Sequence, residues 1–112
     1  MDNIVLIGMP GCGKSTIGVV LAKKLGYRFL DSDLLIQEQY ENTLENLIAE
    51  HGDEGFITLE NAVNKSINVK RTVIATGGSA VYGSEAMEHL SEIGTVIYLE
   101  VPEEELNLKP LQ

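Results

Sequence analysis

Short hydrophobic runs alternate along the chain with longer segments in which hydrophobic residues recur every three or four positions. Residues 4–7 form an apolar run that ends at Gly8, which is typical of a strand buried on both faces. Residues 15–25 carry apolar side chains at helical spacing and end before Gly26, a residue suited to a left-handed helix cap. The same two patterns predict strands at residues 27–30, 72–76 and 95–99, and helices at residues 34–40, 44–50, 54–69 and 84–93.

The alternation of strands and helices predicts the fold class. A strand–helix–strand order favours an α/β fold with a mostly parallel sheet and right-handed crossovers. We therefore expect a three-layer αβα arrangement with about four strands. No repeat or linker-like stretch divides the 112 residues, so residues 1–112 are expected to form a single domain.

The composition excludes several classes of protein and indicates a cellular compartment. The chain has 44% hydrophobic residues and a formal net charge of −9, which indicates an ordinary globular core and an acidic surface. An acidic surface argues against binding to nucleic acid or to an anionic membrane, and no apolar run is long enough to span a bilayer. The N-terminus shows no signal peptide, and the lone Cys12 cannot form an internal disulfide, so we expect a cytoplasmic protein.

The clearest motif lies between the first strand and the first helix. Residues 8–15 match the pattern G-x-x-x-x-G-K-[ST] at every fixed position. Gly11 and Gly13 let successive backbone N–H groups point into one concavity, and Lys14 supplies a positive charge to the outer phosphates of a nucleotide. The alternative, a glycine-rich turn with a solvated lysine, does not account for the strand and helix on either side. We expect an ATP site formed by Gly11, Cys12, Gly13, Lys14, Ser15 and Thr16, with the Ser15 hydroxyl directed at Mg²⁺.

Two aspartates and two glycines follow the next strands. Asp31 and Asp33 are expected on the same side of the chain, at the carboxyl end of the sheet and beside the phosphate loop. One carboxylate there can hold Mg²⁺ through water while the other accepts a proton from a hydroxyl. The alternative is a pair of helix-capping aspartates, with Asp33 as the cap of the following helix. Gly77 and Gly78 allow a substrate to approach the backbone closely, or form a plain strand-to-helix turn.

Together these motifs resemble the shikimate kinase family, P-loop phosphotransferases of the nucleoside-monophosphate-kinase-like group. The similarity rests on residues 8–18, 30–33, 52–60, 76–81 and 96–100, in order and at similar spacing. The resemblance implies a kinase that transfers the γ-phosphoryl group of ATP to a hydroxyl of a small metabolite. It also implies catalytic roles for Lys14 and Asp33, Mg²⁺ ligands at Ser15 and Asp31, and substrate contacts from Asp33, Ile57, Gly77, Gly78 and Ser79.

Three features differ from the pattern of that family. Ile57 stands where the resemblance implies an arginine that pairs with the substrate carboxylate, and Ser79 replaces a glycine. Glu60, which that arginine would neutralise, is expected to reach the surface. The family also continues beyond residue 112 with a lid, further arginines and a fifth strand, whereas Arg28 and Arg71 both precede strands here. We therefore expect a shortened core without the lid and final strand, monomeric or weakly self-associating, that uses shikimate itself poorly.

Two further functions stay open on the sequence. A nucleotide-binding module that has lost catalysis, or a kinase core without activity, would keep the phosphate loop and lack the lid with its arginine. A nucleoside-monophosphate kinase is the third hypothesis, although the two aspartates and two glycines fit the shikimate kinase group better.

Overall fold

Four parallel strands form the centre of the structure. The structure is a computed structural model that describes residues 3–8, 13–78 and 80–99. The described strands pair in the order β2–β3–β1–β4, and all three pairings are parallel, as predicted. Their bounds are Asn3–Gly8 for β1, Arg28–Asp31 for β2, Thr72–Ala75 for β3 and Gly94–Leu99 for β4.

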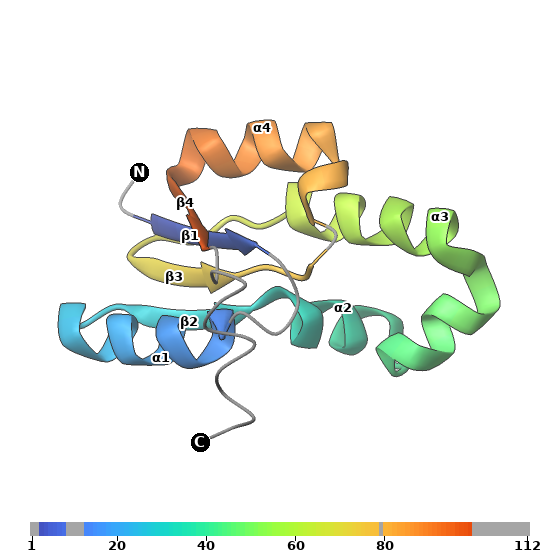
Figure 1. Cartoon of the computed structure of the whole chain (residues 1–112), viewed down its shortest axis with the longest axis horizontal. Helices are drawn as coiled ribbons and strands as arrows, with labels where there is room; N and C mark the ends of the chain where they lie inside the picture. The colour runs from blue at the N-terminus through green and yellow to red at the C-terminus, as the bar shows by residue number, and fades with distance from the viewer. Residues whose placement is uncertain (1–2, 9–12, 79, 100–112) are drawn as a thin grey trace, which may run out of the picture.

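Helices cover both faces of this sheet, which confirms the three-layer prediction. Helix α1 (Lys14–Leu25) lies on one face, and α4 (Ser84–Ile93) lies on the other beside the second half of α3 (Leu44–Lys65) (Figure 1). Helix α2 (Ser32–Tyr40) and the bend in α3 extend past the carboxyl ends of the strands, and a short 3₁₀ turn at Ala80–Tyr82 leads into α4. No helix in the described ranges is long and apolar enough to cross a membrane.

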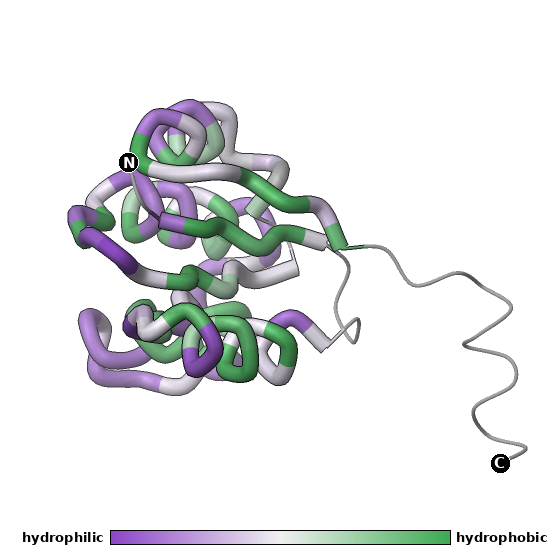
Figure 2. Tube along the Cα trace, turned by 90° about the vertical axis from the view of Figure 1, so that its left-hand side faces the viewer, coloured by the Kyte–Doolittle hydropathy of each residue, from purple (hydrophilic) through white to green (hydrophobic). Residues whose placement is uncertain are grey.

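Alternate residues of the central strand enter two separate cores. Val5 and Ile7 of β1 pack with Ile74 and Leu90 on the α4 face, whereas Leu6 packs with residues of α1 and β3 on the opposite face. Figure 2 shows hydrophobic residues along the strands at the centre of the sheet, whereas the helices carry both hydrophobic and hydrophilic residues. Burial on both faces explains why residues 4–7 form an unbroken apolar run.

A third apolar cluster joins α2 to α3 beyond the end of the sheet. Ile36, Leu47, Phe56 and Val63 are buried there together. Leu47 belongs to the first half of α3, and the chain then bends at Gly52, whose φ of 75° and ψ of 172° are not helical. The two predicted helices are therefore both present, separated only by Gly52. This cluster fixes the position of α2, and hence of the aspartates at its start.

The second half of α3 ends earlier than predicted. The spacing of apolar residues predicts a helix as far as residue 69, but the helix ends at Lys65, and the hydroxyl of Ser66 donates to the Val63 carbonyl. The segment that follows is held by Asn3, whose side chain donates to the carbonyl of Val69 at 2.8 Å and accepts from the Thr72 amide at 3.0 Å. Hydrogen bonds from a residue 66 positions away thus override the local helical pattern.

Gly18 lets α1 pack closely against β2. An added Cβ would lie 2.6 Å from Cε1 of Phe29 and 3.4 Å from Cδ1 of Leu6. Overpacking of a core costs about 1–3 kcal/mol, against a gain of about 1 kcal/mol from the higher helix propensity of alanine. We expect Gly18→Ala to lower the free energy of unfolding measured in urea, while Val20→Ala on the exposed side of the same helix changes it less. An unfolding free energy at or above that of the wild type would contradict this packing.

Candidate active site

A cavity at the carboxyl end of the sheet collects most of the predicted site residues. Its volume is about 340 Å³. The end of β2, the start of α1 and the turn after β3 all contribute to its wall, as expected for a ligand site in a parallel sheet. The lining residues are Gly13, Lys14, Ser15, Thr16, Asp31, Asp33, Thr76, Gly77 and Gly78.

Lys14, the first residue of α1, reaches back to the end of β1. Its ammonium group donates to the carbonyl of Gly8 at 2.9 Å, and the residue is only 8% exposed. The preceding Gly13 has φ 84° and ψ 22°, a left-handed conformation in which a side chain would be strained. The turn therefore places a positive charge and the N-terminus of α1 at the same cavity, and both attract anions.

Asp31 connects the end of β2 to α1 through a side-chain hydrogen bond. Its Oδ2 accepts a hydrogen bond from the Ser15 hydroxyl at 3.2 Å, and its Oδ1 accepts from the backbone amide of Asp33 at 2.9 Å. Asp31 is thus the N-cap of α2, so the alternative that gives this role to Asp33 names the wrong residue. Both aspartates nevertheless line the cavity, because the capping turn after the strand carries Asp33 back toward it.

Asp33 is a carboxylate in a partly desolvated, negative environment. Burial raises the pKa of its carboxyl above the usual range, the nearby Asp31 raises this pKa further, and the charge of Lys14 lowers it. A carboxylate whose pKa is raised holds a proton more readily than an exposed one does. Asp33 is therefore suited to receive a proton from a bound hydroxyl.

Gly77 separates Asp33 from a buried glutamate on α3. A Cβ added at Gly77 would lie 2.6 Å from Oδ1 of Asp33 and would also clash with Oε2 of Glu60. Glu60 is only 2% exposed, so the expectation that it reaches the surface is wrong. Its place four residues after the buried Phe56, on the same helical stripe, was the signal for burial in the sequence.

Thr76 is a site residue that the sequence reasoning missed. Its hydroxyl donates to the Leu6 carbonyl at 2.8 Å, and its backbone amide donates to the same oxygen at 3.1 Å. These bonds extend the pairing of β3 with β1 past the last strand residue and so fix the start of the glycine turn. Thr76 opens the segment 76–81 on which the family resemblance rests, but a threonine at the end of a buried strand carries no pattern that assigns it a place in the site.

The remaining predicted site residues are not brought into this cavity by the described structure. Ile57 is half-buried on α3 and is absent from the cavity lining. Gly11, Cys12 and Ser79 lie outside the described residues, so their assigned contacts stay predictions.

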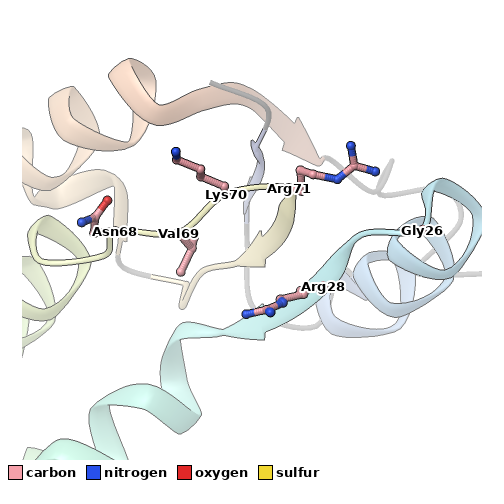
Figure 3. Close-up of a pocket in the computed structure, with 6 residues that line it drawn as sticks. All are labelled: Gly26, Arg28, Asn68, Val69, Lys70 and Arg71. Carbon is pink, nitrogen blue, oxygen red and sulfur yellow. The ribbon is translucent and has the colours of Figure 1, made fainter.

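Arg28 and Arg71 lie at the other end of the sheet, as expected from their positions before strands. Together with Gly26 and residues 68–70 they line a larger cavity of about 550 Å³ (Figure 3). The smaller cavity is the better candidate for an active site despite its size, because it lies at the carboxyl end of the strands and contains the aspartates and Lys14.

The sheet order, the glycine-rich connection from β1 to α1 and the lysine at the start of that helix define the class of P-loop nucleotide-binding proteins. A family model described as shikimate kinase matches residues 10–108. The chain belongs to the shikimate kinase family.

Individual relatives agree with that assignment. Shikimate kinase 2 of Yersinia pseudotuberculosis serotype O:3 (strain YPIII) is 42% identical over 98 residues, which cover 88% of this chain and 56% of that relative. The chain therefore spans a little over half the length of the curated relatives it matches. A solved shikimate kinase from Acinetobacter baumannii in complex with shikimate has 39% identity and a TM-score of 0.85, over 97% of this chain and 61% of that one. A gluconokinase from Sinorhizobium meliloti 1021, at 22% identity and a TM-score of 0.61, shares the fold.

Proposed function

We propose that this chain is an ATP-dependent kinase that phosphorylates a hydroxyl of a small metabolite. The observation that carries the proposal is the convergence of Lys14, the Ser15–Asp31 pair and Asp33 on one cavity at the carboxyl end of the sheet. Phosphoryl transfer needs little covalent chemistry from a protein and depends mainly on positioning and charge neutralisation. Membership of the shikimate kinase family supports the same reaction class.

Mg²⁺ fits the oxygen atoms that this end of the cavity offers. The hydroxyl of Ser15 and a carboxylate oxygen of Asp31 lie 3.2 Å apart, and both are hard donors of the kind that Mg²⁺ prefers. The described residues contain no cluster of three or more acidic, histidine or cysteine ligands, which suits an ion that keeps waters and shares nucleotide phosphates. When bound, Mg²⁺ would neutralise charge on the phosphates of ATP, with Ser15 and Asp31 holding it.

In the proposed reaction the substrate oxygen attacks the γ-phosphorus of ATP. The bond from that phosphorus to the oxygen bridging it to the β-phosphate breaks, and ADP leaves with the electron pair. The proton of the attacking hydroxyl passes to the carboxylate of Asp33, which the raised pKa favours. Lys14 stabilises the charge on the outer phosphates during transfer.

The substrate is proposed to be a small hydroxy compound, for which shikimate itself is a poor example. By resemblance to the family, an arginine that pairs with the substrate carboxylate is replaced by Ile57, an apolar residue. Among the described lining residues, Lys14 is the only cation and faces the phosphate loop, while Asp31 and Asp33 are acidic. A substrate carboxylate would therefore gain less from these residues than a neutral hydroxy compound would.

The experiment that tests the function is ADP release from ATP and Mg²⁺ against a panel of hydroxy acids, polyols and shikimate. We expect at least one neutral hydroxy compound to stimulate ADP release, and the Lys14→Met variant to show no stimulation. Saturation at micromolar shikimate would contradict the substrate assignment. ATP binding without stimulation by any hydroxy compound would favour the alternative of a nucleotide-binding module.

Gly77→Ala is expected to impair transfer without weakening nucleotide binding. The added methyl group must displace Asp33, Glu60 or the turn itself, because a Cβ would lie 2.6 Å from Asp33 Oδ1. Misplacing a catalytic group by about 1 Å can cost roughly a hundredfold in rate. The measurement is kcat with the best hydroxy compound, with the Kd for ATP as the internal control. A variant with unchanged kcat would show that Asp33 tolerates this displacement.

A further inference from the structure

We propose that the cavity at the amino end of the sheet binds a small anion that carries two or more phosphate groups. This cavity, which we call the basic cavity, is separate from the candidate active site and does not depend on the proposed function. Its volume of about 550 Å³ falls within the range of small-molecule sites. It is lined by Gly26, Arg28, Asn68, Val69, Lys70 and Arg71.

The charge around the basic cavity is opposite to that of the whole chain. Only 8 of the 112 residues are lysine or arginine and the net charge is −9, yet three of the six lining residues are basic and none is acidic. Both arginines of the chain are among them. A guanidinium group binds phosphate through two parallel hydrogen bonds, so arginine is the residue most suited to phosphate recognition.

Carbonyl oxygens near the basic cavity are occupied by hydrogen bonds within the protein. The carbonyl of Val69 accepts from the Asn3 side chain at 2.8 Å, that of Lys70 accepts from the Thr72 hydroxyl at 2.9 Å, and that of Arg71 accepts from the Arg28 amide at 2.9 Å. Asn3 is 3% exposed and also donates to the carbonyl of Ile93 at 2.9 Å. These hydrogen bonds therefore hold the segment before β3 in place. They also mean that the partly negative carbonyl oxygens of this segment are already bonded within the protein.

Arg71 is held in a conformation that few residues with side chains adopt. Its φ is 50°, in the left-handed region, and its guanidinium carbon lies 5.3 Å from the centre of the Tyr27 ring. Such backbone strain is concentrated at ligand-binding and functional sites in proteins. The backbone conformation sets the direction in which the Arg71 side chain leaves the chain, and the contact with the Tyr27 ring holds its guanidinium group.

The three cations lie at separate points around the basic cavity. Figure 3 shows Arg28 extending from β2 beneath the segment that precedes β3, while Lys70 and Arg71 leave that segment in different directions. Cations distributed in this way suit a ligand whose negative charges are separated, such as a di- or triphosphate, better than one compact anion.

Strands β2 and β3, of four residues each, run from this end of the sheet to the end that contains the candidate active site.

The test is calorimetric titration of inorganic tripolyphosphate into the Lys14→Met variant, which removes the lysine of the phosphate loop. We expect one binding event, weakened about tenfold by a further Arg28→Gln or Arg71→Asn substitution. Asparagine is chosen at position 71 because it tolerates a positive φ. Lys65→Gln, which removes an exposed charge paired with Glu85 outside the basic cavity, is the matched control and should leave the affinity unchanged.

Two outcomes would overturn the proposal: no binding to the Lys14→Met variant, or binding that both arginine substitutions leave unchanged. Equal affinity for citrate would overturn the assignment to phosphate. If either arginine variant fails to fold, the binding site can be located by backbone amide chemical shifts in the Lys14→Met protein, which needs no substitution in the basic cavity. Tripolyphosphate must then shift the amides of Arg28 and of residues 68–71, and unchanged amides there would refute the site.

Discussion

Replacing Lys14 by methionine is expected to reduce ATP turnover by a hundredfold or more, the loss typical when one preorganised charge or donor is removed from a reacting centre. Lys14 is 8% exposed, and its ammonium group is held 2.9 Å from the Gly8 carbonyl at the cavity. In this partly desolvated position its charge would act on the phosphates of a bound nucleotide with little screening by water. Methionine keeps most of the side-chain volume and removes the charge, so the loss reports electrostatics more than packing.

The measurements for this prediction are the Kd for ATP and the rate of ADP release with the best hydroxy compound. Lys23→Met, in the exposed last turn of the same helix, removes an equal charge and should leave both values close to those of the wild type. Turnover of the Lys14 variant within a few-fold of the wild type would exclude a role for this lysine in the reaction.

Asp33→Asn is expected to abolish most of the transfer and to stabilise the fold at neutral pH. Loss of a general base typically costs a hundredfold to ten-thousandfold in rate. Burial and the neighbouring Asp31 raise the pKa of the Asp33 carboxyl in the folded protein, whereas in the unfolded chain this pKa returns to its usual range. The unfolded chain therefore releases this proton first as the pH rises, and the folded state loses stability across the interval between the two pKa values.

Asparagine carries no charge at any pH, so its advantage should depend on pH. We expect the Tm of Asp33→Asn to equal that of the wild type in acid, below both pKa values, and to exceed it at pH 7. Glu88→Gln, which removes an exposed carboxylate on α4, serves as the control for net charge. A lower Tm for Asp33→Asn at pH 7 would show that the Asp33 carboxylate stabilises the fold, against the pKa argument.

Elements with strong local patterns were predictable from the sequence. The run at residues 4–7, the helix that ends at Gly26 and the helix at Ser84–Ile93 all occur where the apolar spacing predicted them. Gly26 has φ 73°, as the predicted left-handed cap requires. The boundary at Lys65 was not predictable, because it depends on Asn3, a residue distant in sequence that holds the following segment.

The candidate site shows the same division between local and distant causes. The carboxyl-end location and the approach of Asp31 to Ser15 follow from strand order and motif spacing. The identity of the helix cap did not follow, since alternation along a strand does not describe the turn in which Asp31 accepts from the Asp33 amide. The helical stripe indicated that Glu60 is buried, but its position against Gly77 depends on the packing of α3 on the sheet end, which single-sequence patterns do not specify.

The most direct test of the account is whether the terminal phosphate of ATP reaches a carbon-bound hydroxyl. The chain is incubated with Mg²⁺, ATP labelled at the γ-phosphate and the hydroxy compound that best stimulates ADP release, and the products are separated. We expect a labelled phosphate monoester of that compound, formed in step with ADP and absent with the Asp33→Asn variant. Label found only in ATP and inorganic phosphate would contradict the proposed kinase.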